Sequence, residues 1–131
     1  GHYLDVPLEW LAQSLSGDLR VGLAQSKRSA EYFHVFHRCQ ANFPWRSHAQ
    51  WFLQQMQRWQ QVQGEIDAAA VATRVYRTDL YREIFGTMHN LPSADVKPEG
   101  EHASAWTMPG ARGDVEIGPD LFIDGAMFDA R

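Results

Sequence analysis

The sequence predicts an α/β protein that is mainly α-helical and has a small β-hairpin near its end. Apolar residues recur at helical intervals in residues 6–16 and in three segments between residues 47 and 88. Short apolar runs flank the dipeptide Asp124-Gly125, which favours a two-residue hairpin turn. The length of 131 residues is that of one compact domain, so residues 1–131 are expected to form a single domain.

Composition and charge limit the classes of function. Hydrophobic residues make up 44% of the chain and charged residues 21%, which is typical of a folded protein. The formal net charge is -4 and the basic residues are scattered, so we expect no direct nucleic-acid binding. Because no apolar run approaches the roughly 20 residues that span a bilayer, we expect no membrane span in this chain. The one cysteine, Cys39, predicts no internal disulfide.

The first predicted element is a short helix over Val6–Ser16. Asp5 is its expected N-cap, Pro7 lies in its first turn, and Gly17 follows its last residue. Residues 17–44 show no sustained period, and we expect a loop with one short strand there.

A long amphipathic helix is predicted over Ser47–Gln63. Ser47 and Gln50 have the spacing of a capping box, and Gly64 is positioned to end the helix. The apolar residues of its expected buried face are Phe52, Leu53, Met56, Trp59 and Val62.

Two further helices are expected to complete a helical subdomain. Asp67 is the predicted N-cap of a helix over Ala68–Tyr76, and Thr78 is the predicted N-cap of another that stops before Asn90. The second of these helices has one apolar face, formed by Leu80, Tyr81, Ile84, Phe85 and Met88.

The last third of the chain changes in character. Pro, Gly, Ser and charged residues dominate Leu91–Gly113, which predicts a long, mobile loop. Val115–Ile117 is expected to be a short strand. Leu121–Ile123 and Ala126–Phe128 are predicted to pair as the terminal hairpin around Asp124-Gly125.

The residue types used in catalysis and metal binding do not form a complete set. His34, His37 and Cys39 suggest zinc, but the second pair of ligands that structural zinc needs does not follow, so solvent-facing histidines beside a buried cysteine are favoured. Asp79 and Glu83 are one helical turn apart, a spacing that usually marks solvated helix charges. No phosphate loop or nucleophile motif occurs. We therefore predict no catalytic residue, no metal, no cofactor and no enzymatic activity.

A candidate ligand site lies where the long helix is expected to begin. Trp45, Arg46, Ser47 and His48 bring a guanidinium and a hydroxyl next to the free amides of a helix N-terminus, which together favour an anion. The structural alternative is that Ser47 only caps the helix, Trp45 packs against it and Arg46 faces water.

Several segments resemble one known family. They are "YLDVPLEWLAQSLSG" (residues 3–17), "NFPWRSHAQWFLQQMQRW" (42–59), "VYRTDLYRE" (75–83) and "GPDLFIDGAMFDAR" (118–131). Together they resemble the C-terminal region of the nitrate and bicarbonate branch of ABC-transporter solute-binding proteins. The resemblance implies the C-terminal part of a type II periplasmic-binding-protein-like fold, in which two α/β lobes hold the anion between them. It also implies a longer protein in which most ligand contacts lie upstream of this chain.

Two features depart from the family pattern. Gln60 stands where a glycine is expected after Trp59, and the loop "SAWTMPGARGDVEIGPD" (residues 104–120) is longer than in typical transporter components. The longer loop resembles instead a cytoplasmic branch, the nitrate sensors that hold an RNA-binding antiterminator partner until nitrate arrives.

The resemblance thus implies a solute-binding component for nitrate, nitrite or bicarbonate. Its partner would be an ABC permease for a periplasmic transporter component, or an antiterminator-type regulatory protein for a cytoplasmic sensor. The alternative is a regulatory or protein-interaction domain attached to a nitrate-transporter component. An exposed Trp45 or Trp51 with an ordered segment 91–113 would favour that alternative, and a pocket joining His34, His37 and Asp79 would favour an enzyme.

Overall fold

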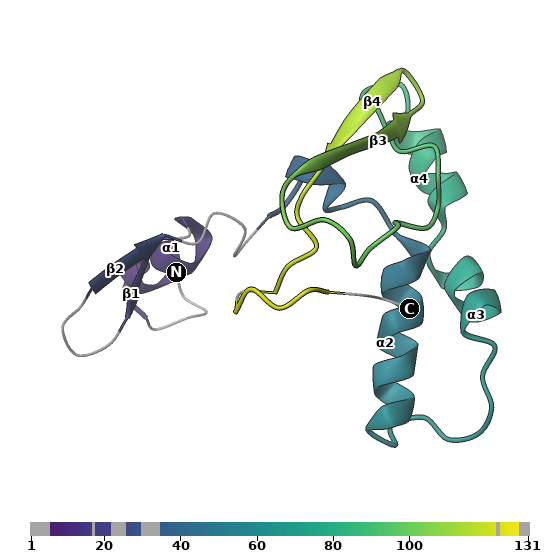
Figure 1. Ribbon diagram of the computed structural model, residues 1–131, viewed down its shortest axis with the longest axis horizontal. Coiled ribbons are helices and arrows are strands. Elements are labelled where there is room, and N and C mark those ends of the chain that lie inside the picture. Colours follow the sequence, from purple (N-terminus) through teal and green to yellow (C-terminus); the bar gives the residue numbers. More distant parts are fainter. Residues whose placement is uncertain (1–5, 17, 22–25, 30–34, 123, 129–131) are drawn as a thin grey trace. The chain divides into compact units, whose positions relative to one another are not determined.

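The computed structural model describes residues 6–16, 18–21, 26–29, 35–122 and 124–128 (Figure 1). The chain divides into two compact units, residues 1–36 and residues 37–131. The second unit contains the helices α2, α3 and α4 and a two-stranded hairpin, and it holds the buried core.

The first unit combines one helix with one small sheet. Helix α1 spans Leu8–Ser16, two residues shorter at its start than predicted, and its expected cap Asp5 lies outside the described residues. Strands β1 (Asp18–Val21) and β2 (Ser26–Ser29) pair in antiparallel fashion. The prediction of one short strand in this region was therefore wrong. Strands of four residues, one of them the polar run Ser-Lys-Arg-Ser, carry no apolar alternation that sequence reasoning can detect.

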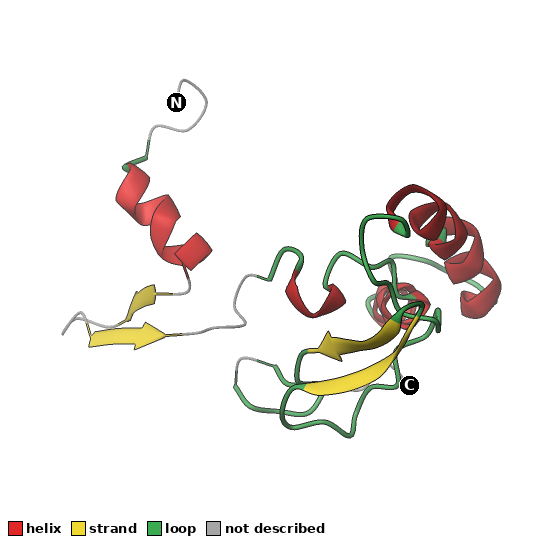
Figure 2. Ribbon diagram, turned by 90° about the horizontal axis from the view of Figure 1, so that it is seen from above, coloured by secondary structure: helices red, strands yellow, loops and turns green. Residues whose placement is uncertain are grey.

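The second unit begins with a short 3-10 helix, η1 (Arg38–Gln40), and continues with three α-helices and two strands (Figure 2). The helices are α2 (Arg46–Arg58), α3 (Ala68–Val75) and α4 (Thr78–Phe85). Strands β3 (Trp106–Gly110) and β4 (Gly113–Ile117) form an antiparallel hairpin. Helix α2 packs against α3, and η1 packs against β4.

The core of the second unit is built around Trp45. This indole is 1% exposed, lies 4.7 Å from the ring centroid of Phe43, and donates a hydrogen bond from Nε1 to the Gln40 carbonyl oxygen. Tyr81 and Phe85 of α4 pack against the core from one side. Among the described residues, its buried members are Phe43, Trp45, Leu91, Met108, Val115 and Ile117.

The start of α2 differs from the predicted capping box. Trp45 is the N-cap and makes no side-chain capping bond, so Ser47 lies inside the first turn of the helix. The Ser47 hydroxyl instead accepts a hydrogen bond from the backbone N–H of Lys97 at 3.3 Å. The capping-box prediction was wrong because a tertiary contact takes the Ser47 oxygen that the box requires.

The end of α2 also comes earlier than predicted, at Arg58 instead of Gln63. Gln60 has a left-handed backbone, with φ 58°, and cannot continue the helix. The N–H of Gln60 donates to the Gln57 carbonyl, and the N–H of Gln61 donates to the Met56 carbonyl. This is the pair of bonds of a Schellman motif, in which the left-handed position is usually glycine. Gln60, which replaces the glycine of the family pattern, is therefore the left-handed residue at the end of α2.

Helix α3 follows its predicted position closely, but the prediction of Thr78 as the N-cap of α4 was wrong, and α4 ends at Phe85, earlier than predicted. The Asp67 side chain accepts from the Ala70 N–H at 3.0 Å, which confirms it as the N-cap of α3. The cap of α4 is Arg77, and Thr78 is the first helical residue, 1% exposed. The single apolar face predicted for α4 is divided in two. Tyr81 and Phe85 pack on the core, whereas Leu80, Ile84 and Met88 are exposed.

The segment predicted as one long loop contains strand β3 and several buried residues. Leu91 and Glu99 are 4% and 5% exposed, and the Arg46 N–H donates to the Asp95 carbonyl within the same stretch. The sequence did not predict these anchors, because they depend on contacts with residues that are distant along the chain. Val115–Ile117 is part of β4, as predicted.

The chain also reverses direction near its end, at Asp124-Gly125. Gly125 has φ 86°, the N–H of Phe122 donates to the Ala126 carbonyl, and Leu121 and Met127 form a single bridge. Ile123 lies outside the described residues. The extended two-stranded hairpin is thus β3–β4, and the predicted terminal hairpin is reduced to one bridged turn. The mixture of helices with an antiparallel hairpin is confirmed, and it is consistent with a C-terminal piece of a periplasmic-binding-protein-like fold.

Within the described part of the chain, every helix is too short or too polar to cross a membrane.

We expect Gln60→Gly to stabilise the protein by about 0.5–1 kcal/mol, because glycine adopts the left-handed conformation without the strain of a Cβ. Gln54→Gly is the matched control, since Gln54 is an exposed residue inside α2 and glycine there costs about 1 kcal/mol. Urea denaturation followed by circular dichroism measures both changes. A loss of stability in Gln60→Gly would contradict the strain assigned to residue 60.

Candidate functional site

The four predicted ligand residues lie together at the N-terminus of α2, facing the segment 95–99. Arg46 is held by Asp95: its backbone N–H donates to the Asp95 carbonyl at 2.9 Å, and its Nη1 lies 2.9 Å from Asp95 Oδ2. Its Nη2 donates to the Thr78 hydroxyl at 3.1 Å. A carboxylate of the protein itself therefore lies where an anion at this helix N-terminus is favoured.

The other three residues have partners of their own. Trp45 is buried in the core, and Ser47 accepts from the Lys97 N–H. His48 Nε2 lies 2.7 Å from Glu99 Oε1. The structure thus brings the four predicted residues together and gives each a structural contact. Their role in ligand binding stays a prediction.

Asp95 is shared between two arginines. Arg82 of α4 places Nη1 2.6 Å from Asp95 Oδ1, opposite the contact that Arg46 makes. Burial alone would raise the pKa of Asp95, but hydrogen bonds from Arg82 and Thr78 and the charge of Arg46 outweigh it and hold the pKa below its usual value. With Asp95 ionised, two guanidinium groups share one carboxylate, and this cluster carries a net positive charge.

Arg82 also organises the chain before Asp95. Its guanidinium donates to the backbone carbonyls of Pro92, Ser93 and Ala94, at 2.9, 3.3 and 3.0 Å from Nη2. Its Cζ lies 5.0 Å from the ring centroid of Phe43, a cation–π contact with the core. Arg82 therefore fixes the path of residues 92–95 relative to α4.

A second group of charged side chains was not predicted from the sequence. Lys97 Nζ lies 3.0 Å from Asp120 Oδ1 and 3.4 Å from Glu99 Oε1, and both carboxylates are almost fully buried. His48 contacts Glu99, and His102 Nδ1 lies 2.7 Å from Asp120 Oδ2. The sequence contains a faint signal for this group: Lys97, Glu99 and His102 cluster in a Pro- and Gly-rich stretch with few other anchors.

Asp120 is the most heavily bonded carboxylate of this group. It accepts from the backbone N–H groups of Gly100 and His102 at 3.2 and 3.3 Å. The His102 ring stacks on Trp106, with centroids 3.8 Å apart. Burial would raise the pKa of Asp120, but the hydrogen bonds from His102 and Lys97 and their charges lower it below its usual value.

The remaining candidates from the sequence lie in different settings. His34 is outside the described residues, so a pocket that joins it to His37 and Asp79 is not tested. Cys39 is partly buried and has φ 53°. Asp79 pairs with Arg77 at 2.6 Å on the surface, and this salt bridge lowers the pKa of Asp79. Among the described residues, no group of three His, Cys, Asp or Glu side chains is arranged to hold a metal ion.

One of the comparisons finds a similar protein, and that relative is a binding protein. Along 98% of this chain, the sequence is 28% identical to the nitrate/nitrite binding protein NrtA of Synechococcus elongatus. The matched part is 28% of that relative, so the chain spans less than a third of its length. No family model matches the chain, and no solved structure matches it.

The pKa of Asp120 predicts how stability depends on pH. Because the pKa is lower in the folded protein than its usual 3.8, the stabilisation is fully present above pH 3.8 and is lost as pH falls through the folded-state value. Asp120→Asn should lower the free energy of unfolding near neutral pH by about 3 kcal/mol, since it removes one partner from a buried ion pair, and should flatten the loss in acid. Urea denaturation at a series of pH values measures both.

Asp79→Asn is the matched control, because Asp79 forms an ion pair of similar length on the surface, where water screens the charges. Its effect on the free energy of unfolding should be much the smaller of the two. Equal effects of the two substitutions would contradict a structural role for the buried group.

Proposed function

We propose that the chain is part of a solute-binding protein for a small oxyanion: nitrate, nitrite or bicarbonate. The observation that supports this most is the similarity to a nitrate/nitrite binding protein along almost the whole chain. We further propose that the chain corresponds to the C-terminal region of such a protein, within a fold of two lobes. A protein of this class binds its solute through preformed donors in a cleft and needs no covalent chemistry.

The start of α2 is the part of this chain that favours an anion. The guanidinium groups of Arg46 and Arg82 share the single carboxylate of Asp95, which leaves one positive charge over. Arg46 Nε is buried and has no hydrogen-bond partner among the described residues. The positive end of the α2 dipole adds to the attraction. We therefore propose that Trp45, Arg46, Ser47 and His48 border the oxyanion site and that Arg46 carries most of the local affinity.

Closure of two lobes around the anion would be the signal that such a protein passes on. In a periplasmic transporter component the receiver would be an ABC permease. In a cytoplasmic nitrate sensor it would be an antiterminator-type regulatory protein. The first partner would couple binding to uptake, and the second would couple it to gene control.

Calorimetric titration of nitrate, nitrite and bicarbonate tests this proposal, with the 131-residue chain and the longest natural form that contains it as parallel samples. We expect the longer form to bind one of the anions. Arg46→Met in that form should weaken binding at least about tenfold, since a hydrogen bond from a charged donor is lost. Arg77→Met is the control, because Arg77 forms a surface pair with Asp79.

The outcomes separate the two parts of the proposal. Binding by the longer form that is unchanged in Arg46→Met would support the solute-binding function and remove α2 from the site. Absence of binding by both samples, with both shown to be folded, would reject the oxyanion function.

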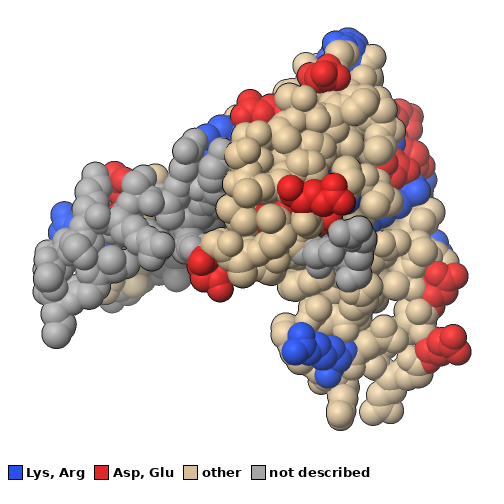
Figure 3. Space-filling view, viewed as in Figure 1, with Lys and Arg blue, Asp and Glu red and all other residues tan. Residues whose placement is uncertain are grey.

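The alternative function is a regulatory or protein-interaction domain, and some observations favour it. Leu80 and Ile84 of α4 and Met88, which follows its end, are exposed, and on the face shown in Figure 3 most of the described surface carries no charge. The segment 91–113 contains a strand and buried anchors, as this alternative requires. Trp45, however, is buried, and Trp51 is half-buried. Replacing Ile84 and Met88 by serine should then abolish partner binding without changing the anion titration.

A further inference from the structure

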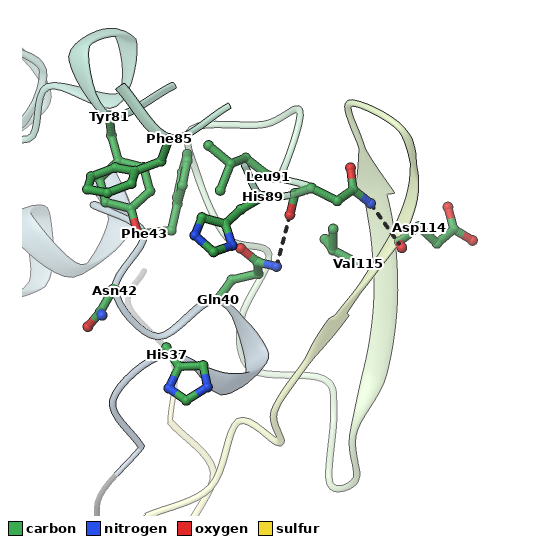
Figure 4. A pocket seen from close by; sticks show the side chains of 11 residues that line it. His37, Gln40, Asn42, Phe43, Tyr81, Phe85, His89, Leu91, Asp114 and Val115 are labelled. Atoms are coloured by element: carbon green, nitrogen blue, oxygen red, sulfur yellow. Dashed lines mark hydrogen bonds between the residues drawn. The ribbon is translucent and has the colours of Figure 1, made fainter. Parts of the chain in front are cut away.

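A pocket of about 770 Å³ lies between η1, α4 and β4 (Figure 4). It contains none of the four residues at the start of α2 that we assign to the oxyanion. Its volume falls within the roughly 300–1,000 Å³ typical of sites for small organic molecules, and it is far larger than a nitrate ion requires. The pocket is therefore a candidate for a second kind of ligand.

One wall of the pocket is a row of aromatic rings. Tyr81, Phe85 and His89 follow one another at intervals of four residues, on α4 and just beyond its end. The Tyr81 and Phe85 centroids are 4.8 Å apart, and those of Phe85 and His89 are 6.3 Å apart. Phe43 extends the row, 5.6 Å from Tyr81. A flat ring is the ligand shape that matches such a wall, because aromatic rings stack or meet edge to face.

The opposite side of the pocket offers polar groups that the protein does not use. Within the described part of the chain, the exposed side chains of His37 and Asn42 make no hydrogen bond to protein, and neither does the exposed imidazole of His89 at the end of the aromatic wall. Gln40 is fixed in place, since its Nε2 donates to the Asn90 carbonyl at 3.2 Å and leaves its own amide oxygen as an acceptor. Amides and neutral imidazoles each carry both donors and acceptors. The ring edge of the ligand would therefore meet both hydrogen-bond donors and hydrogen-bond acceptors.

The charge of the lining excludes a strongly charged ligand. None of the described residues in the lining is Lys or Arg, so an anion would leave water without a compensating cation from them. Asp114 is the one carboxylate among the lining residues that the structure describes, and Figure 4 shows its carboxylate directed away from the cavity. The nearest wall groups are thus uncharged amides, rings and aliphatic side chains.

The backbone at the rim of the pocket adopts an energetically unfavourable conformation. Cys39 and Gln40 are consecutive non-glycine residues with left-handed backbones, φ 53° and 58°. Residues in such conformations cost free energy and are concentrated at functional sites. Here the left-handed turn carries the Gln40 side chain to Asn90, whose own Nδ2 donates to the Gly113 carbonyl at 2.9 Å.

We propose that this pocket binds a small, planar, uncharged heteroaromatic molecule whose ring edge both donates and accepts hydrogen bonds. The ring would lie along Tyr81, Phe85 and His89, and its edge would meet His37, Gln40 and Asn42. This site is independent of the oxyanion site, so either can exist without the other.

The test is an NMR titration of the ¹⁵N-labelled chain with benzimidazole, with sodium benzoate and sodium nitrate as separate probes. Benzimidazole should shift the amide signals of residues that line the pocket, such as Gln40, Phe85 and His89. Benzoate should bind at least about tenfold more weakly, because its carboxylate finds no cation there. Nitrate should not shift these signals.

Variants of the wall locate the binding. His89→Ala should weaken benzimidazole binding roughly threefold to tenfold, as should Phe85→Leu if its spectrum remains that of a folded protein. Met88→Ala is the matched control, because Met88 adjoins His89, is exposed and does not line the pocket. The proposal is overturned if benzimidazole leaves the pocket signals unchanged, if benzoate binds as tightly, or if His89→Ala and Met88→Ala behave alike.

Discussion

The second unit depends on the salt bridges that Asp95 makes to two arginines. Asp95 lies in a stretch without regular secondary structure, and it contacts Arg46 of α2 and Arg82 of α4 through its two carboxylate oxygens. Arg82 adds bonds to the carbonyls of residues 92–94 and a contact with the Phe43 ring. Two helices, a loop and the core are thereby joined at one carboxylate. Charge-assisted hydrogen bonds of this geometry fix the relative orientation of the groups that they join, in addition to stabilising the fold. Apolar packing alone does not fix orientation in this way.

A second group of ion pairs anchors the chain closer to its end. It consists of Lys97, Glu99, Asp120, His48 and His102. Burying carboxylates is costly unless they are paired and hydrogen-bonded. Asp120 meets this condition with Lys97, His102 and two backbone N–H groups. Polar contacts thus hold in place a segment that offers little apolar surface, and they fix residue 120 beside residues 97–102. The same contacts occupy Ser47 and His48, so the candidate ligand residues also belong to the framework of the fold.

Two kinds of site can be distinguished in this unit by their charge. At the start of α2 the guanidinium groups outnumber the carboxylate, and this imbalance is the feature on which the proposed oxyanion site rests. The pocket beside α4 is built instead from rings and amides, and its volume suits a larger, neutral molecule. A protein with both sites would bind two ligands of different chemistry without competition between them.

The sequence by itself determined the helices and their approximate positions, because apolar period, the Asp67 cap and the Asp124-Gly125 turn are local signals. It also placed Trp45, Arg46, Ser47 and His48 next to one another. Only the tertiary structure decided that α2 ends at a left-handed Gln60, that α4 divides its apolar residues between core and surface, and that residues 91–105 are anchored by Arg82 and Lys97. The bonds that close α2 are local, but the glycine that usually marks such an end is absent at residue 60. The other two features depend on partners that are distant along the chain, and contacts between such residues leave no periodic pattern in the sequence.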